Sequence, residues 1–316
     1  MPYSKIPVLL SRIDQDINPN RVVEHYIDRW HQIVSNYSGR FLTKEEDKLV
    51  ALSGLAKVYT PLLGDEYIAG IWRSRIFTEL LWHAETESFP ETERPLRYRA
   101  PSWSWASIDA HITCHHALSP SDLRGQTCCT VLEAQVETLG HDTTGQVKGG
   151  FLRVSGVLRP CHFWTQPKDL RPQVLLDTTD HIAEIVLTDF FPIILEAMFD
   201  HPSEIDDSIQ LYCLPVLHSV RSNFRGMVVR AGSTPETFER VGMFYTSISE
   251  DDGLETFAKF VIVMFEIPES FLDHPDPYER WRRLVAEEYQ KTGYVRQSPE
   301  LIEGLKRMEC REIVIV

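Results

Sequence analysis

The sequence has little positive charge and no long apolar run. Lys and Arg total 32 against 46 Asp and Glu, which gives a net charge of −14. Because nucleic acids and anionic membrane surfaces are bound by clustered cations, we expect neither as a partner. The longest apolar stretches, residues 260–265 and 313–316, are far shorter than the roughly 20 residues that span a bilayer.

Paired cysteine motifs and the signatures of common enzymes are also missing. The six cysteines form no Cys-x-x-Cys pair, and the N-terminal apolar patch is too short for a signal peptide. This pattern is typical of reduced thiols in a cytoplasmic protein. The chain has no Gly-x-Ser-x-Gly elbow, phosphate-binding loop, Gly-x-Gly-x-x-Gly or His-Glu-x-x-His motif. We therefore expect no cofactor, and we do not expect a hydrolase, a nucleotide triphosphatase, a nicotinamide enzyme or a zinc protease.

What is present at the N-terminal end is helical periodicity. Apolar residues recur every three or four positions over 21–37, and again in a second segment that ends near Gly64. Gly54 lies inside the second segment, and close approach of another element would explain a glycine there. Residues 65–80 predict a third helix, because Ile68, Ile71, Trp72, Ile76 and Leu80 share its face.

After residue 97 the apolar period changes to two. Residues 128–158 predict a β-hairpin, and further strands are expected at 182–187, 209–217, 226–230 and 241–245, the last two as an antiparallel pair. Residues 259–267 are apolar almost throughout and indicate a buried strand or a short buried helix, of which the length favours the strand. Two helices, over 278–292 and from 299 onward, and a final strand at 310–316 follow. The predicted class is α+β, with N-terminal helices, a central antiparallel β core that is barrel- or sandwich-like, and C-terminal helices. Residues 1–97, 98–270 and 271–316 would form these parts of one compact unit.

Residues 98–109, Tyr-Arg-Ala-Pro-Ser-Trp-Ser-Trp-Ala-Ser-Ile-Asp, are the most distinctive segment. On a strand, Trp103 and Trp105 would share one face and the serines would share the other. The two indoles would then form either a wall of the core or a wall of a pocket. His111 and Cys114-His115-His116 follow Asp109, and they allow a metal site, a solvated loop or a proton donor beside the Trp pair.

Several blocks together resemble fungal heterokaryon-incompatibility (HET) proteins, in the region that follows their HET domain. The matching residues are Trp30, Ile33-Val34, Tyr37-Ser38, Arg40, Leu42-Thr43, Asp47-Lys48-Leu49, 51–56, 67–72, Leu80-Leu81-Trp82, 99–107 and 240–244. In such proteins the HET domain precedes these blocks. Here the first expected helix begins at Arg21, so we expect that the HET domain is lacking and that the chain does not trigger incompatibility by itself.

The resemblance implies two functions. It implies that stand-alone HET-related proteins have been recruited into fungal natural-product pathways, and the norbornene-forming Diels–Alderase type of the sordarin pathway is the first to compare. The first hypothesis is therefore a cofactor-free cyclase of fungal secondary metabolism that folds a small apolar substrate in a shaped pocket. The alternative is a non-catalytic recognition or regulatory module that keeps the HET-associated fold as a scaffold.

Under the cyclase hypothesis the candidate catalytic donors are Arg99, Ser104 and His115. Trp103, Trp105, Trp164 and His111 would bind substrate, and no metal is expected. An apolar pocket with convergent donors would favour the enzyme, whereas a solid core and an exposed surface patch would favour the module.

Overall fold

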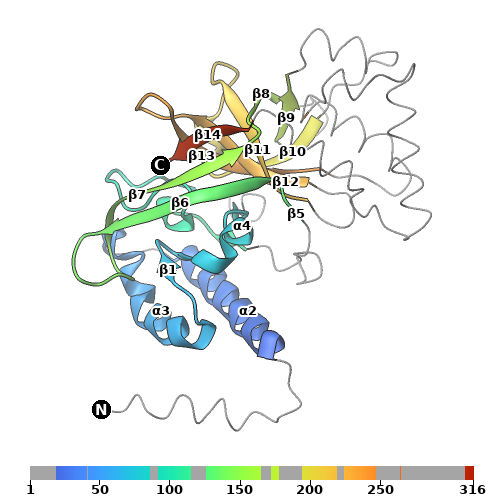
Figure 1. The fold of residues 1–316 in the computed structure, drawn as a ribbon. Coiled ribbons are helices and arrows are strands. Elements are labelled where there is room, and N and C mark those ends of the chain that lie inside the picture. The colour runs from blue at the N-terminus through green and yellow to red at the C-terminus, as the bar shows by residue number, and fades with distance from the viewer. Residues whose placement is uncertain are drawn as a thin grey trace, which may run out of the picture.

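The computed structural model describes residues 19–40, 42–85, 92–114, 126–164, 172–177, 194–218, 224–246, 264 and 310–316. Within these ranges it combines N-terminal helices with an antiparallel β core, and the chain belongs to the α+β class as the sequence predicts. In Figure 1 the helical layer lies below the long strands β6 and β7, and most of the remaining strands of the large sheet lie above them. The predicted C-terminal helices and the strand at 182–187 fall outside the described residues.

The helical layer begins with α2 (Pro19–Ser38) and α3 (Val50–Leu63), which pack against each other. Ile27, Trp30 and Val34 repeat at helical spacing along α2 and are buried. The Trp30 ring lies 5.3 Å from the Tyr59 ring of α3. Both helices were predicted from their apolar period, and both are confirmed. A short 3₁₀ helix, η2 (Glu45–Asp47), leads into α3.

The predicted third helix is wrong over most of its length. Residues 67–72 form a hairpin of β1 (Tyr67–Ile68) and β2 (Ile71–Trp72), and only η3 (Arg73–Arg75) and α4 (Ile76–Glu79) are helical. Ala69 and Gly70 have φ of 44° and 104°, the left-handed values that a two-residue hairpin turn requires. Every residue of this hairpin is buried, so its apolar run has no alternation that distinguishes it from a helix.

The β core contains a closed ring of strands. The elements are β5 (Gln126–Thr127), β6 (Cys129–Thr138), β7 (Val147–Gly156), β8 (Arg159–Trp164), β9 (Gln173–Leu176), β10 (Ile194–Phe199), β11 (Leu211–His218), β12 (Phe224–Ala231), β13 (Thr237–Tyr245) and β14 (Arg311–Ile315). Pairing runs from β8 through β9, β10, β13, β12 and β11 back to β8, always antiparallel, which closes a barrel. The predicted hairpin at 128–158 and the antiparallel pair β12–β13 are confirmed.

One edge of β13 joins the barrel to the rest of the sheet. Its last residues pair with β10, while Thr237 and Phe238 pair with β14, the one parallel contact among the described strands. β14 then pairs with β7, which extends the sheet over the helices. Met227 and Val229 of β12 belong to the core shared with the helices, whereas the alternating Val228 is buried outside that cluster. The barrel therefore has an interior of its own.

Two smaller elements connect these layers. The strands β3 (His83–Ala84) and β4 (Ile112–Thr113) pair antiparallel, and β3 also contacts β10. Between them the chain runs through the 3₁₀ helix η4 (Trp105–Ser107). This path brings the Trp-Ser-Trp segment into the space between the helical layer and the sheet. Among the described residues, no helix is long and apolar enough to cross a membrane.

Candidate functional site

The Trp-Ser-Trp turn, residues Ser102–Ser107, is a turn that runs into η4 and is not the strand that its spacing predicts. The physical reason is capping. The Ser104 hydroxyl accepts a hydrogen bond from the Ala106 N–H at 3.1 Å, which starts a helical turn. Trp103 and Trp105 are 0% and 1% exposed, so both indoles lie in the core.

The same turn is hydrogen-bonded to the β1–β2 hairpin. The Ser104 hydroxyl donates to the Ala69 carbonyl at 2.5 Å, and the Trp105 indole N–H donates to the Gly70 carbonyl at 2.8 Å. Gly70 is required here because a Cβ at this position would lie 2.8 Å from the Trp105 indole nitrogen. Ser104, expected as a catalytic donor, therefore donates within the protein.

Ser102 connects the turn to the sheet. Its hydroxyl donates to the carbonyl of Val316 and accepts the Arg240 backbone N–H at 2.9 Å, and its own N–H donates to Val316 at 3.0 Å. On the other side the Trp82 indole N–H donates to the Trp103 carbonyl at 2.9 Å. The turn thus joins β13 and the C-terminal end of the chain to the helical layer.

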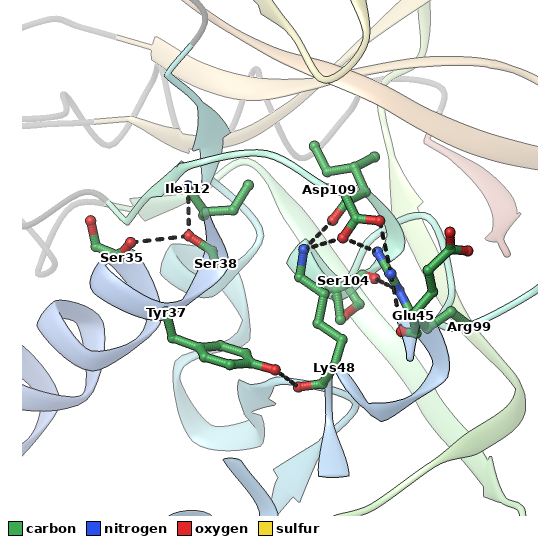
Figure 2. Close-up of polar contacts among 11 residues, drawn as sticks. Ser35, Tyr37, Ser38, Glu45, Lys48, Arg99, Ser104, Asp109 and Ile112 are labelled. Atoms are coloured by element: carbon green, nitrogen blue, oxygen red, sulfur yellow. Dashed lines mark hydrogen bonds and ion pairs between the residues drawn. The ribbon is translucent and has the colours of Figure 1, made fainter. Parts of the chain in front are cut away.

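Beside the turn lies a buried charge cluster of Lys48, Arg99 and Asp109 (Figure 2). Lys48 Nζ donates to the Ile108 carbonyl at 2.6 Å and to Asp109 Oδ1 at 2.7 Å. The Arg99 guanidinium binds Asp109 in bidentate fashion at 2.9 and 3.0 Å. The side chains of Lys48 and Arg99 are 1% and 3% exposed, whereas that of Asp109 is 37% exposed.

Arg99 also makes two bonds to backbone carbonyls. Its Nε–H donates to the carbonyl of Ala106, the residue that Ser104 caps, at 2.7 Å, and its Nη1–H donates to the carbonyl of Glu45 in η2 at 3.1 Å. In Figure 2 the guanidinium lies between the η2 segment and the Asp109 carboxylate. A lysine could not make the same set of hydrogen bonds, because its single amine cannot bind a carboxylate in bidentate fashion and also reach two separate carbonyls. Arg99, expected as a catalytic donor, here holds η2, η4 and Asp109 together.

The electrostatics of the Lys48–Arg99–Asp109 cluster follow from this geometry. Burial lowers the pKa of Lys48 to about 8, and the neighbouring Arg99 adds to that decrease, while Asp109 opposes it. Burial raises the pKa of Asp109, but the hydrogen bonds and charges of Arg99 and Lys48 outweigh it and hold that pKa below its ordinary value. A lysine with such a pKa can act as a base or a nucleophile. Here, however, the amine is enclosed and donates to a backbone carbonyl.

A second charged cluster, which the sequence analysis missed, lies where β13 and β10 meet β3. Arg240 and Asp200 are both 0% exposed, and their side chains pair at 2.5 Å. The guanidinium also donates to the Trp82 carbonyl at 2.5 Å and lies 3.5 Å from the centre of its ring. Arg240 appears in the sequence only as the start of one block of the HET resemblance, and no local pattern marks Asp200 as its partner.

The remaining predicted site residues lie on other elements. Trp164 ends β8 and is half-buried, and its neighbour His162 is exposed with its ring 3.1 Å from Asp177. His111 is half-buried beside the end of α2, where a Cβ on Gly39 would lie 3.2 Å from its ring. His115 falls outside the described residues. The structure therefore brings Arg99, Ser104, Trp103 and Trp105 together and places Trp164 on a separate barrel strand.

The candidate metal ligands are not gathered into a site in the described part of the chain. No group of three His, Cys, Asp or Glu side chains there is placed to hold a metal ion. Asp206 of the Asp206-Asp207 pair accepts the Ser208 N–H at 2.8 Å in an exposed turn. Comparison with known proteins identified no relative, because no protein-family model, curated protein or solved structure matches the chain.

Proposed function

We propose that this chain is a non-catalytic recognition or regulatory module related to fungal HET proteins. The observation that carries the proposal is that the most distinctive segment makes its hydrogen bonds within the protein. Trp103, Ser104 and Trp105 are at most 1% exposed. The Ser104 hydroxyl and the Trp105 indole N–H bond to backbone carbonyls of the hairpin, and the Trp103 carbonyl accepts the Trp82 indole N–H. The buried Trp103 indole N–H has no hydrogen-bond partner among the described residues. The donors of Ser104 and Trp105 are thus used within the protein, where they stabilise the fold.

The blocks that carry the HET resemblance meet in space, which supports a structural meaning for them. Lys48 comes from one block, Ala69 and Gly70 from a second, Trp82 from a third, and Arg99 to Ser107 from a fourth. Hydrogen bonds link the fourth block to the second and the third directly, and Lys48 joins it through Ile108. A signature with this physical basis identifies a type of fold, and a fold alone does not define a reaction.

A cytoplasmic location is part of the proposal. The Cys161 and Cys213 sulfurs face each other at 3.5 Å across β8 and β11 as thiols. Burial raises the pKa of the Cys213 thiol, which keeps it protonated and unreactive. A cytoplasmic location implies that these two sulfurs stay reduced and form no disulfide.

The cyclase hypothesis makes the contrary prediction about the same residues. A cyclase needs donors that face a bound carbonyl, and loss of such a donor lowers turnover while the fold persists. Arg99 and Ser104 instead donate to carboxylate and carbonyl groups of the protein. The module proposal therefore expects their substitution to lower stability.

The test is a turnover assay with candidate polyene aldehydes, read by mass spectrometry for a cyclised isomer of unchanged mass. The proposal predicts the same isomer yield with the protein as with heat-denatured protein. Ser104→Ala, which removes one hydroxyl, should lower the midpoint of unfolding. A cyclised product formed by the native chain, and lost in a Ser104→Ala variant that is still folded, would establish the enzyme instead.

A further inference from the structure

A buried charged contact joins α2 to α4. His31 Nε2 of α2 lies 2.7 Å from Glu79 Oε1 of α4, and the two residues are 8% and 6% exposed. Histidine is the side chain whose ordinary pKa lies in the neutral range, so small influences of its surroundings decide its charge there. The attraction between His31 and Glu79 therefore depends on whether the imidazole carries its second proton.

A second ion pair joins the same two parts of the chain. The Arg75 guanidinium of η3 binds the Glu24 carboxylate of α2 in bidentate fashion, at 3.0 and 2.5 Å, and the two side chains are 18% and 28% exposed. Because a guanidinium keeps its proton throughout the neutral range, this pair does not respond to pH there. Of the two contacts, only the one between His31 and Glu79 changes its charge near neutral pH.

The charges around His31 favour its protonated form. Burial lowers the pKa of His31, and the nearby Arg75 guanidinium acts in the same direction. The charge and hydrogen bond of Glu79, together with the charge of Asp28, outweigh both and hold that pKa above its ordinary value of 6.5. Above pH 6.5 the folded chain therefore binds more protons at this site than the unfolded chain does. The stabilisation by His31 is complete below pH 6.5 and is lost as the pH rises through the folded pKa.

Two further titratable groups lie beside Glu79. Tyr67 of β1 is 5% exposed, and Cys114, which follows β4, is 7% exposed. Burial raises the pKa of both groups and the charge of Glu79 adds to that increase, so both stay neutral throughout the neutral range. Among the described residues that act on Glu79, His31 is therefore the one whose charge changes near neutral pH.

The other charged groups on the neighbouring elements are engaged elsewhere. Lys57 of α3 pairs with Asp142, and Arg73 of η3 pairs with Glu66. Arg29 of α2 is exposed and makes its hydrogen bond along its own helix. A variant that lacks the His31 imidazole separates the response of this contact from that of every other titrating group in the chain.

The position of α2 allows it to detach while the sheet stays intact. It contributes no strand, and Figure 1 shows it in the helical layer below β6 and β7. Its buried face packs Trp30 against Tyr67 and Trp72, with ring centres 5.5 and 5.2 Å apart. Proteins open in cooperative units at free energies below that of global unfolding. Helix α2, held by this packing and by the two ion pairs, is such a unit.

We propose that α2 is held on α4 by a pH-dependent contact, and that loss of the His31 proton above neutral pH increases the population in which α2 is detached. The protonated imidazole donates a charge-assisted hydrogen bond to Glu79. Once the proton has passed to solvent, the carboxylate is buried beside a neutral ring, and Arg75 with Glu24 remains as the charged contact. The inference goes beyond the proposed function, because it describes a property of the fold that holds for a module and for an enzyme.

The titration of His31 in NMR spectra of the full chain tests the contact itself. In the parent chain we expect a midpoint above 6.5, because Glu79 favours the protonated ring. Glu79→Gln keeps the shape and a hydrogen-bond acceptor but removes the charge, so the His31 midpoint should shift downward. A parent midpoint at or below 6.5, or one that Glu79→Gln leaves unchanged, would overturn the inference.

Native-state hydrogen exchange of the α2 amides tests the opening. From about pH 6 to about pH 8.5, the opening equilibrium constant of α2, corrected for the intrinsic exchange rate, should rise several-fold in the parent chain. In His31→Gln, which keeps a polar side chain without the titrating imidazole, that rise should be several-fold smaller. His25→Gln is the matched control, because His25 is exposed on the same helix, and it should behave like the parent chain.

Two exchange results would overturn the inference. One is the same pH dependence in the parent chain and in His31→Gln. The other is exchange of the α2 amides only together with those of the barrel strands β12 and β13, because α2 then does not detach by itself. If His31→Gln does not fold, the titration in Glu79→Gln decides. A cyclised isomer in the turnover assay would overturn the module proposal alone, so the two failures are distinguishable.

Discussion

Replacing Arg99 with methionine tests the role of the Lys48–Arg99–Asp109 cluster. Methionine keeps an apolar stem and removes every guanidinium donor. Two backbone carbonyls, of Ala106 and Glu45, lose a donor, at about 1 kcal/mol each. The bidentate bond to Asp109 adds about 1 kcal/mol. This value is at the low end for a charged pair, because the Asp109 side chain is 37% exposed and its carboxylate still accepts a hydrogen bond from Lys48 in the variant. We expect Arg99→Met to lower the free energy of unfolding by about 3 kcal/mol.

The assay is urea unfolding followed by tryptophan fluorescence, with Arg73→Met as the matched control. Arg73 also contacts a glutamate in bidentate fashion, at 2.5 and 3.3 Å from Glu66, but the two side chains are 38% and 63% exposed. Such a surface pair contributes about 0.5 kcal/mol. If Arg99→Met and Arg73→Met shift the unfolding free energy equally, the reasoning about the cluster is refuted.

Further predictions concern the turn, helix α3 and pH. Gly70→Ala should destabilise the chain by about 2–4 kcal/mol in urea unfolding, because φ is +104° there and the Cβ would collide with the Trp105 indole; an unchanged midpoint would contradict that contact. Gly54→Ala should stabilise by about 1 kcal/mol, measured the same way, because a Cβ there would meet no described atom within 4 Å; a loss of stability would show that α3 is packed differently at that point. The pKa of Lys48 is about 8 when folded and 10.5 ordinarily, so the unfolded chain binds more protons at this site between those values, and the contribution of Lys48 to the free energy of unfolding rises with pH there. Thiols whose pKa is raised by burial, such as those of Cys128 and Cys129, act in the opposite direction in both chains. From pH 8 to 10.5 the slope of the unfolding free energy should therefore be more positive in the parent chain than in Lys48→Met; equal slopes would contradict the buried amine.

Local periodicity predicted much of this fold. The apolar repeat that contains Trp30 predicts α2, because a helix with one buried face must repeat every three to four residues. Alternation around Ala134 and Leu152 predicts the β6–β7 hairpin for the corresponding reason. Each of these elements buries one face and exposes the other. The resulting repeat of apolar and polar residues is what makes them predictable from the sequence.

Elements that are buried on all sides give no such signal. Residues 67–72 pack on every face, so the hairpin resembles a helix until the positive φ of Ala69 and Gly70 is known. The spacing of Trp103 and Trp105 suggests a strand, yet the hydroxyl of Ser104 starts a 3₁₀ turn. The sequence does not show whether a serine lies in a strand or caps a helical turn. For Ser104, the hydrogen bond from the Ala106 N–H shows that it is a cap.

The site was harder to predict than the fold because its bonds span long sequence distances. Arg99 and Ser104 were identified as important, but their acceptors decide what they do. Lys48 meets Asp109 across 61 positions, and Arg240 meets Asp200 across 40. A single sequence shows charged residues at these positions without showing which pairs fold together, so it does not separate a donor for substrate from a donor for the protein itself.

The central claim, that the Trp-Ser-Trp turn is enclosed in the core, is tested most directly by hydrogen exchange of the indole N–H groups in NMR spectra. The Trp105 N–H donates to Gly70 and the Trp82 N–H donates to Trp103. We predict that both exchange only through global unfolding, with a free energy that follows urea stability, while Trp164 on half-buried β8 exchanges faster. Exchange of the Trp105 N–H within minutes in the stable native state would contradict the account and indicate a solvent-filled pocket.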